Sequence, residues 1–596
     1  MTFFKSFLAS CLGIFVTFVL FILTLFIFLI ATSSQPLPEV KDNGILTIEM
    51  TGTLPARVLP SPFETYFDPA AGNKLSLVTL KENLTKAAAD ERIKGVWVKA
   101  NLMNASWANL QQAYDYLEEY KESGKFLYFS TDDIGFNEQS YYLATVADSV
   151  FSPPYTNFEF DGFVSQFTFY TNMLDKIGIE PEIFRVGKFK SAVEPFLETS
   201  ASPESRQQIS EILNAATVTF TDAVAKKTGR SVDEVTELLD SPPVNRLESA
   251  IEFGLIDELM FENEIENVIR TRMGIGPDDD LNTISFKNYG QIPPASVGVS
   301  TPSTFDRIAV IYADGPIMPD FGSETPFDNN ATITSENIKK QIDEALNSSS
   351  VKAIVVHINS PGGSATTSDL IWNALKTASD KKPVVASMGS VAASGGYYIA
   401  MGADTVVANS NTITGSIGIF NLLFNVKELT EDKIGLDFEV VKTHQYADLL
   451  DLTTPFTPAE ERVIQQNVEN GYEVFLKRVA ESRGMSRDEV NELAQGRVWT
   501  GTAAKDAGLI DELGSIDDAI TIAAEMAGVE EYRIENYPKA KGLFEVIMSG
   551  TEAKVYSYIN SWFPFMNNEE VKNLRMLMNE PAGQNWMILP TDISVR

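Results

Sequence analysis

The stretch Pro383-Val-Val-Ala-Ser-Met-Gly-Ser-Val-Ala-Ala-Ser-Gly-Gly-Tyr-Tyr-Ile-Ala-Met-Gly-Ala-Asp404 predicts a strand that turns directly into a helix. Val384 to Ala386 read as the end of a buried strand, and the helix is expected from Tyr397 onward. Between them, Ser394-Gly-Gly396 would present a hydroxyl beside amides at a helix N-terminus, where an oxyanion is stabilised. On its own, however, a Ser-Gly-Gly sequence is far more typical of an ordinary helix N-cap.

Composition narrows the possible functions. The 596 residues are enough for roughly two to four domains, and 81 acidic against 47 basic residues argue against a nucleic-acid partner. A single cysteine, Cys11, excludes a disulfide framework and a cysteine-rich metal site, and no HExxH motif occurs, so neither a metal nor a cofactor is expected. Only His357 and His444 could serve a Ser-His-Asp triad, so a nucleophilic serine would otherwise need a different base.

The N-terminus predicts a membrane anchor over residues 1–34. Residues 7–31 are almost wholly apolar, which fits the roughly 20 residues that a bilayer-spanning helix requires. A cleaved secretory signal is the alternative, but its apolar core would be only about 7–15 residues long. Lys5 is the only charge before the span and favours a single-pass protein with its N-terminus inside and everything after Gln35 outside the cytoplasm.

Beyond the anchor, the sequence repeats itself with a period near 256 residues, which indicates an internal duplication. Four pairs of segments match in the same order: 44–54 with 307–317, 93–101 with 351–359, 141–150 with 397–406, and 254–259 with 508–513. In each copy short apolar strands alternate with amphipathic helices, which predicts an α/β fold with largely parallel strands.

These boundaries predict five segments: an anchor (1–34), a first repeat (40–276), a connector (277–305), a second repeat (306–538) and a C-terminal tail (539–596). The tail holds apolar clusters such as Trp586-Met-Ile-Leu589. We expect these clusters to form packing or subunit-contact surface, or to face a substrate.

The serine side of a possible site is found only in the second copy. Ser394 corresponds to Glu138 of the first copy, and the glycine pair Gly362 and Gly363 has no counterpart there. A glycine pair directly after a strand could add amides to an oxyanion hole, although on the dipeptide alone a plain turn is the better explanation.

The lysine side is found only in the first copy. Lys190 falls opposite Ala447, and Lys188 opposite Gln445. A free lysine, with a pKa near ~10.4, is protonated at neutral pH, but burial can lower that pKa by up to ~3–5 units. Packed against the other copy, Lys190 could therefore accept the proton of a serine hydroxyl. Ser416 in the Thr-Gly-Ser loop could orient the amine.

These features resemble the signal peptide peptidase A family in its long, duplicated form, serine–lysine proteases of family S49. The resemblance covers nearly the whole chain and is carried by the motifs at 187–196, 359–364, 393–396, 414–418 and 497–501. It implies two tandem copies of a Clp protease/crotonase-like α/β fold after one transmembrane helix. It also favours Lys190 over Lys188, because the family's lysine directly precedes Ser-Ala-Val-Glu-Pro.

The resemblance implies a membrane-anchored serine endopeptidase that assembles as a homotetramer. It would degrade cleaved signal peptides and other hydrophobic peptides at the outer face of the cytoplasmic membrane. Ser394 would be the nucleophile, Lys190 the general base and Ser416 the residue that orients the lysine. The amides of Gly362, Gly363 and Gly395 would form the oxyanion hole.

Two other functions are compatible with the same fold, since a fold does not fix a function. One is a crotonase-type protein acting on acyl-CoA; the sequence offers no basic cluster near Gly362 for the phosphates of coenzyme A. The other is a non-catalytic membrane scaffold, which the retention of Ser394 and Lys190 in opposite copies disfavours. The sequence leaves open whether this pair would meet within one chain or between subunits.

Overall fold

A computed structural model describes residues 37–540 except 62–63, 66–67, 69, 242–245, 278 and 321–331, together with 586–588 and positions 13, 16, 17, 20 and 24. The predicted anchor, residues 1–34, therefore lies almost entirely outside the described residues. Within them, no helix combines the length and the apolar composition that crossing a membrane requires.

The first repeat is built on a six-stranded sheet in which all neighbouring strands are parallel. In spatial order the strands are β6 (Glu258–Leu259), β4 (Ser149–Ser152), β3 (Phe126–Ser130), β2 (Ile93–Met103), β1 (Gly44–Gly52) and β7 (Thr283–Ser285). One face packs against α3 (Leu77–Ala89), α4 (Trp107–Lys121) and α5 (Glu138–Ala144), the other against α11 (Glu262–Met273). Because β7 lies in the predicted connector, that segment also completes the first sheet.

The second repeat has the same plan. Its main sheet runs β15 (Val498–Thr500), β13 (Ile413–Gly415), β11 (Val384–Ala393), β9 (Val351–Ser360), β8 (Arg307–Asp314), β17 (Arg533–Tyr537), with β12 (Thr405–Ala408) and β16 (Glu512–Leu513) attached through β11. The central strands are Val-, Ile- and Ala-rich and almost fully buried, as is typical of parallel strands covered on both faces. β11 continues to Ala393, beyond its predicted end near Ala386, because β9 and β13 flank it on either side.

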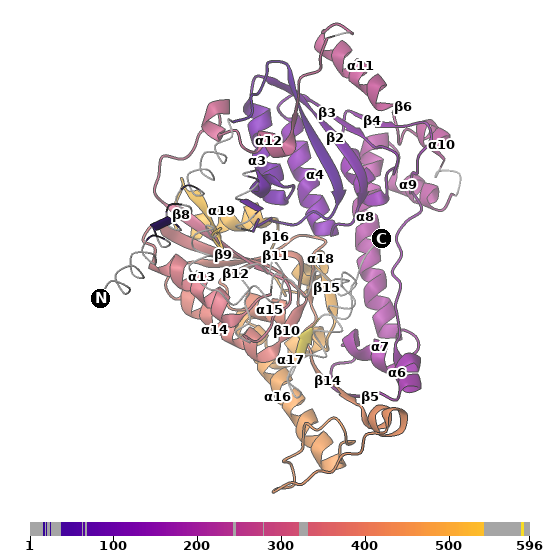
Figure 1. The fold of residues 1–596 in the computed structure, drawn as a ribbon, viewed down its shortest axis with the longest axis vertical. Coiled ribbons are helices and arrows are strands. Elements are labelled where there is room, and N and C mark those ends of the chain that lie inside the picture. The colour runs from indigo at the N-terminus through magenta and orange to yellow at the C-terminus, as the bar shows by residue number, and fades with distance from the viewer. Residues whose placement is uncertain are drawn as a thin grey trace.

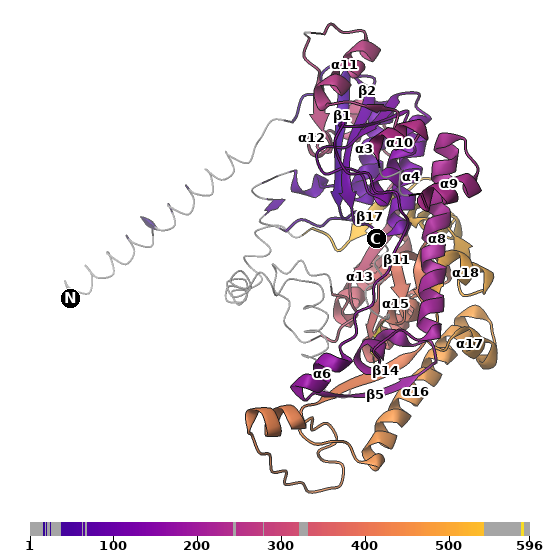
Figure 2. The same ribbon diagram turned by 90° about the vertical axis from the view of Figure 1, so that its right-hand side faces the viewer.

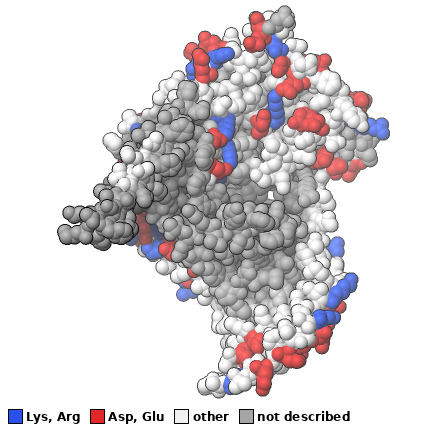
Figure 3. All heavy atoms as spheres, viewed as in Figure 1, with Lys and Arg blue, Asp and Glu red and all other residues white. Residues whose placement is uncertain are grey.

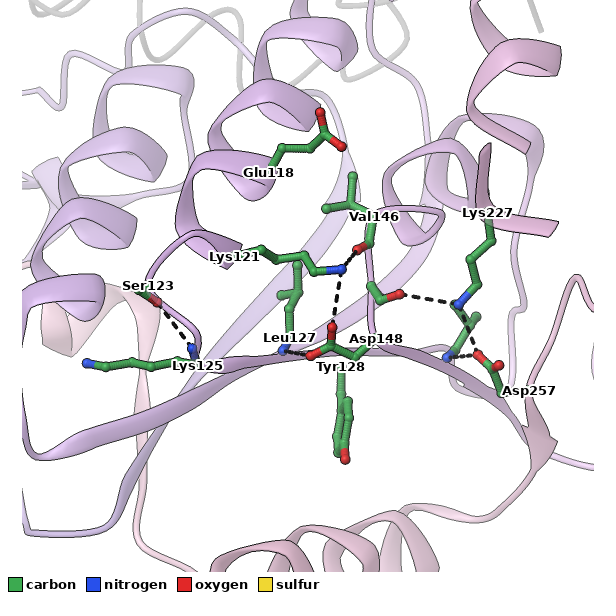
Figure 4. Close-up of polar contacts among 12 residues, drawn as sticks. Glu118, Lys121, Ser123, Lys125, Leu127, Tyr128, Val146, Asp148, Lys227 and Asp257 are labelled. Carbon is green, nitrogen blue, oxygen red and sulfur yellow. Dashed lines mark hydrogen bonds and ion pairs between the residues drawn. The ribbon is translucent and has the colours of Figure 1, made fainter. Parts of the chain in front are cut away.

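Equivalent hydrogen bonds recur in the two repeats. The carboxylate of Asp148 accepts a hydrogen bond from the Leu127 amide at 3.0 Å and pairs with Lys121 at 3.2 Å (Figure 4). At the corresponding place in the second repeat, Asp404 accepts a hydrogen bond from the Val384 amide at 2.9 Å. A second equivalent pair of contacts joins Lys227 to Asp257 and Arg483 to Asp511. The duplication thus extends to individual interactions.

A single hydrophobic core joins the two repeats. It contains side chains from α3 and α4 of the first repeat and from α19 (Ile516–Met526) of the second, together with residues of both main sheets. In Figure 1 the first repeat lies above the second, with these helices between the sheets. The far side of the second sheet is covered by α13 (Ser335–Asn347), α14 (Ala365–Ser379), α15 (Gly395–Ala400) and α16 (Pro458–Arg483).

Two elements of the first repeat extend along the second. Strand β5 (Glu180–Val186) pairs antiparallel with β14 (Ile419–Asn425) over their full lengths. Helix α8 (Pro203–Thr228) runs down the side of the molecule, as both Figure 1 and Figure 2 show. It begins at Ser202, whose hydroxyl accepts the Ser205 amide, and ends at Gly229 in the left-handed conformation. These two elements carry the segment around residue 190 to the second repeat.

Charged side chains are spread over the surface. On the face shown in Figure 3, Asp and Glu are interspersed with Lys and Arg at both ends of the molecule. Exposed ion pairs of this kind contribute at most about 1 kcal/mol each. The hydrophobic cores, rather than the surface charges, therefore hold the two repeats together.

Candidate active site

Ser394 occupies the turn between β11 and α15. Its backbone is strained, with φ 54° and ψ −112°, and its amide donates to Gly415 O at 2.8 Å. A non-glycine residue in this region needs support from its surroundings and is often functional. The side chain forms no capping hydrogen bond, so the interpretation of Ser394 as an ordinary N-cap is wrong. Its hydroxyl points instead toward a buried lysine.

That lysine is Lys190. It follows β5 at the end of a short loop, and its Nζ lies 2.8 Å from Ser394 Oγ. The same Nζ lies 3.0 Å from Ser416 Oγ and 3.2 Å from Ser416 O. All three residues are fully buried, at 0% exposure. The structure therefore brings together, within one chain, the three residues that the sequence placed in separate segments.

The environment of Lys190 favours the neutral amine. Burial alone lowers the pKa of Lys190 well below its ordinary value, and in the described part of the chain no carboxylate pairs with it. A neutral amine has two N–H donors and one lone pair. Ser416 supplies two acceptors, a carbonyl and a hydroxyl oxygen, for the two N–H groups. The lone pair is then left for the hydroxyl proton of Ser394.

Ser416 is itself held in an unusual conformation. Its φ is 51°, and its amide donates to Arg497 O at 2.7 Å. Directly before it, β13 pairs with β11 near Ser394. Ser416 is thus fixed from both sides, by the strand that leads to Ser394 and by the loop before β15.

The loop that carries Lys190 is held by residues that the sequence analysis did not single out. The Phe189 amide donates to Gln495 O at 2.8 Å. Gln208 of α8 donates to Ser191 Oγ at 2.9 Å and accepts from the Val498 amide at 3.1 Å. The signal available in the sequence was a polar residue, Gln208, beside the apolar positions of the segment that forms α8; in the structure it is only 1% exposed.

Gly496 presses directly on the lysine. Its φ is +78°, and a Cβ there would lie 2.6 Å from the Lys190 amide nitrogen. Only glycine allows the two backbones to approach so closely.

The two members of the glycine pair face opposite directions. In β10 (Gly362–Ser364), the Gly362 amide donates to Ser360 Oγ at 3.1 Å, and the Gly362 carbonyl accepts from the Ile317 amide at 2.8 Å. The Ser364 amide donates to Ile317 O. Because main-chain groups along a strand point alternately to opposite sides, the N–H and C=O of Gly363 point away from Ile317.

Gly363 and Gly395 lie close together beside Ser394. A Cβ built on Gly395 would lie 3.1 Å from the Gly363 amide nitrogen, and one on Gly363 would lie 1.9 Å from Ile317 O. The main chain of these two glycines is therefore adjacent at the turn that carries Ser394. Gly362, which was expected to contribute as well, has its amide engaged by Ser360 and is turned away.

Neither histidine is part of this arrangement. His357 is buried in β9, where its Nδ1 lies 3.1 Å from Ser387 Oγ and burial lowers its pKa to about 4. His444 is exposed. Across the residues that the structure describes, no group of three His, Cys, Asp or Glu side chains could hold a metal ion. Lys190 is the basic group that contacts Ser394.

Comparisons with known proteins identify the family. The model of peptidase family S49 matches twice, at residues 120–275 and 376–530, and the Clp protease model matches residues 328–414. Serine protease SPPA, chloroplastic, from Arabidopsis thaliana is 34% identical over 83% of this chain and 71% of its own length. Protease 4 of Salmonella typhi is 31% identical over 80% of this chain and 76% of its own, and Protease 4 of Haemophilus influenzae is 29% identical over 86% and 84%. With its tandem Clp protease-like α/β repeats, the chain belongs to peptidase family S49 and is a serine protease.

Proposed function

We propose that the protein is a membrane-anchored endopeptidase with a serine–lysine pair, in which Ser394 is the nucleophile and Lys190 the general base. The observation that carries this proposal is the distance of 2.8 Å between Lys190 Nζ and Ser394 Oγ at a fully buried amine. The second repeat (306–538) supplies the serine and the first (40–276) the lysine. The loss of each group in the opposite copy supports this division.

The chemistry follows from the geometry. As Ser394 Oγ attacks the carbonyl carbon of the scissile bond, its proton passes to the lone pair of Lys190 Nζ. The negative charge that develops on the carbonyl oxygen is stabilised by the amides of Gly363 and Gly395. The Lys190 ammonium then protonates the leaving amine, and the C–N bond breaks to give an acyl-enzyme. Water, which gives a proton to Lys190, then attacks the ester carbon. The bond from that carbon to Ser394 Oγ breaks, Lys190 returns the proton to Oγ, and the second product leaves.

Ser416 acts as a positioning residue in this scheme. By accepting the two N–H groups of the neutral amine, it directs the lone pair toward Ser394 Oγ. When Nζ takes up the serine proton, its third N–H faces the Ser394 oxygen. Both protonation states are therefore accommodated without movement of the side chain.

The substrates are proposed to be extended hydrophobic peptides, including signal peptides that remain in the membrane after cleavage. Support comes from the apolar stretch 7–31, which would hold the protein at the membrane. The proposal includes a homotetramer on the outer face of the cytoplasmic membrane, as the resemblance to the signal peptide peptidase A family implies.

The test uses the full-length protein in detergent with a hydrophobic fluorogenic peptide and with a fluorophosphonate probe for activated serines. Ser394→Ala is expected to abolish both turnover and labelling. Lys190→Ala is expected to reduce both by a factor of about 10²–10⁴, the usual contribution of a general base. Full turnover by either variant would disprove the pair.

A further inference from the structure

The C-terminal tail places a strand inside the site. Residues Trp586–Ile588 form β18, which pairs antiparallel with β10: Gly362 with Ile588, Gly363 with Met587, and Ser364 with Trp586. Its other edge pairs with β14, where Phe420 is opposite Trp586. The four-stranded sheet has the order β10-β18-β14-β5. In the sequence β18 lies about 220 residues after β10 and about 160 residues after β14.

Each strand of this sheet leads to a residue of the candidate active site. β10 contains Gly363, β14 begins just after Ser416, and β5 leads into the loop of Lys190. β18 also contacts α15, the helix that starts directly after Ser394. The tail strand therefore lies across the catalytic centre.

The main-chain groups that β18 meets are those of the proposed oxyanion hole. Because Gly362 and Ser364 bond to Ile317, the N–H and C=O of Gly363 face the opposite side, where Met587 is its partner. An extended peptide substrate would need the same groups. Met587 is thus in the position of a substrate residue.

Without β18 this sheet has a gap of one strand. β10 and β14 are not neighbours in the sheet; each pairs with β18 instead. Two strands that flank a third lie roughly 9–10 Å apart, so the gap accepts one extended chain with hydrogen bonds on both edges. Such strand addition is a general mode of peptide recognition. The apolar sequence Trp586-Met-Ile-Leu589 has the character proposed above for the substrates.

We propose that the gap between β10 and β14 is a peptide-binding site whose resident ligand is the chain's own segment 586–588, which competes with substrate. The inference rests on the proposed function, since it treats the gap as the substrate's position. Its consequence is that substrate enters only when β18 leaves the sheet.

Met587→Pro in the full-length protein tests the proposal, because proline removes the N–H that faces Gly363. Met587→Ala is the matched control, since it shortens the side chain but keeps the N–H. Loss of one strand hydrogen bond is expected to speed fluorophosphonate labelling of Ser394 and to lower KM for the peptide, each by about 2- to 10-fold. In Met587→Ala, segment 586–588 is expected to keep more of its ability to compete with substrate than in Met587→Pro. A synthetic peptide of residues 583–591 should slow the fluorophosphonate labelling and the peptide turnover of the Met587→Pro variant.

Hydrogen exchange separates this inference from the proposed function. Amides of β10 and β14 are expected to exchange faster in Met587→Pro than in wild type, whether or not Ser394 is the nucleophile. Equal exchange and equal labelling in wild type, Met587→Pro and Met587→Ala would overturn the inference and leave the serine–lysine pair intact. Changed exchange together with a Ser394→Ala variant that still turns over would overturn the proposed function and show only that the tail binds there.

Discussion

Replacing Lys190 with methionine removes the amine from the site but keeps an unbranched side chain of similar length. Lys190 Nζ lies within 3.2 Å of three oxygen atoms, which are Ser394 Oγ, Ser416 Oγ and Ser416 O, and the side chain is fully buried. The methionine can fill most of this space without opening a cavity. The change therefore removes a base without removing the packing around it.

Two effects are expected. The first is a fall in kcat by about 10³–10⁴-fold, at the upper end for a general base. Because Ser394 and Lys190 act as a unit, the double variant Lys190→Met/Ser394→Ala should lose little more activity than either single variant. The second concerns stability. In the unfolded chain Lys190 holds its proton up to its ordinary pKa of 10.5, whereas burial makes it lose that proton at lower pH in the folded protein.

Between these two pKa values, unfolding takes up one proton at Lys190. The free energy of unfolding of the wild type therefore rises with pH, relative to Lys190→Met, by about 1.4 kcal/mol per pH unit. This contribution is fully present above pH 10.5 and is lost as the pH falls toward the lowered pKa. Scanning calorimetry of both proteins at a series of pH values below 10.5 should show the wild-type Tm rising with pH against that of the variant.

Lys188→Met is the matched control. Lys188 lies two residues away on the same loop but is exposed, with its Nζ 5.1 Å from the centre of the Phe189 ring. Its replacement removes the same kind of side chain and should leave kcat within about twofold of wild type, as for surface substitutions elsewhere. If the Tm difference between wild type and Lys190→Met did not change with pH, Lys190 would be protonated in the folded protein and could not be the base.

Three further predictions concern the same site. First, kcat should fall as the pH drops below the lowered pKa of Lys190, because the protonated amine cannot accept the serine proton; a pH–rate profile that stays flat to about pH 5 would contradict this. Second, Gly496→Ala should abolish activity, since its Cβ would lie 2.6 Å from the Lys190 amide nitrogen. Gly484→Ala, with φ +66° but nothing within 4 Å, should cost only about 1 kcal/mol of stability and retain kcat. Third, Gln208→Leu should lower kcat about tenfold through displacement of the lysine loop, while the exposed Gln207→Leu has no effect; equal kinetics of these two variants would show that the Gln208 hydrogen bonds do not position the loop.

The division of the site between two repeats follows from the fold. The two repeats share the plan of their main sheets, but the first has Glu138 where the second has Ser394. Glu138 is buried and accepts the Asp161 amide at 3.0 Å, so this position has become part of the first repeat's interior. The shared core and the pairing of β5 with β14 then fix the lysine of one repeat against the serine of the other.

Local patterns in the sequence determined much of this protein. The alternation of apolar strands with helices predicted two α/β repeats. Buried parallel strands and amphipathic helices can be recognised from the pattern of apolar residues within the segment itself. The complementary losses at Ser394 and Lys190 predicted both halves of the site, and the family comparisons confirm the serine protease that these residues suggested. Each of these signals lies within a short segment or in the alignment of two segments.

Tertiary structure alone decided how these parts meet. Whether Lys190 reaches Ser394 within one chain depends on β5, α8 and the loop at Gly496, which are positioned by contacts far apart in the sequence. The opposite orientations of Gly362 and Gly363 depend on Ile317, which pairs with this short strand from outside. The position of residues 586–588 between β10 and β14 is set by hydrogen bonds of the main chain, which every residue except proline can form as donor and acceptor. Because such bonds leave no trace in side-chain identity, the sequence of the tail could predict an apolar cluster but neither its strand nor the partner that it finds.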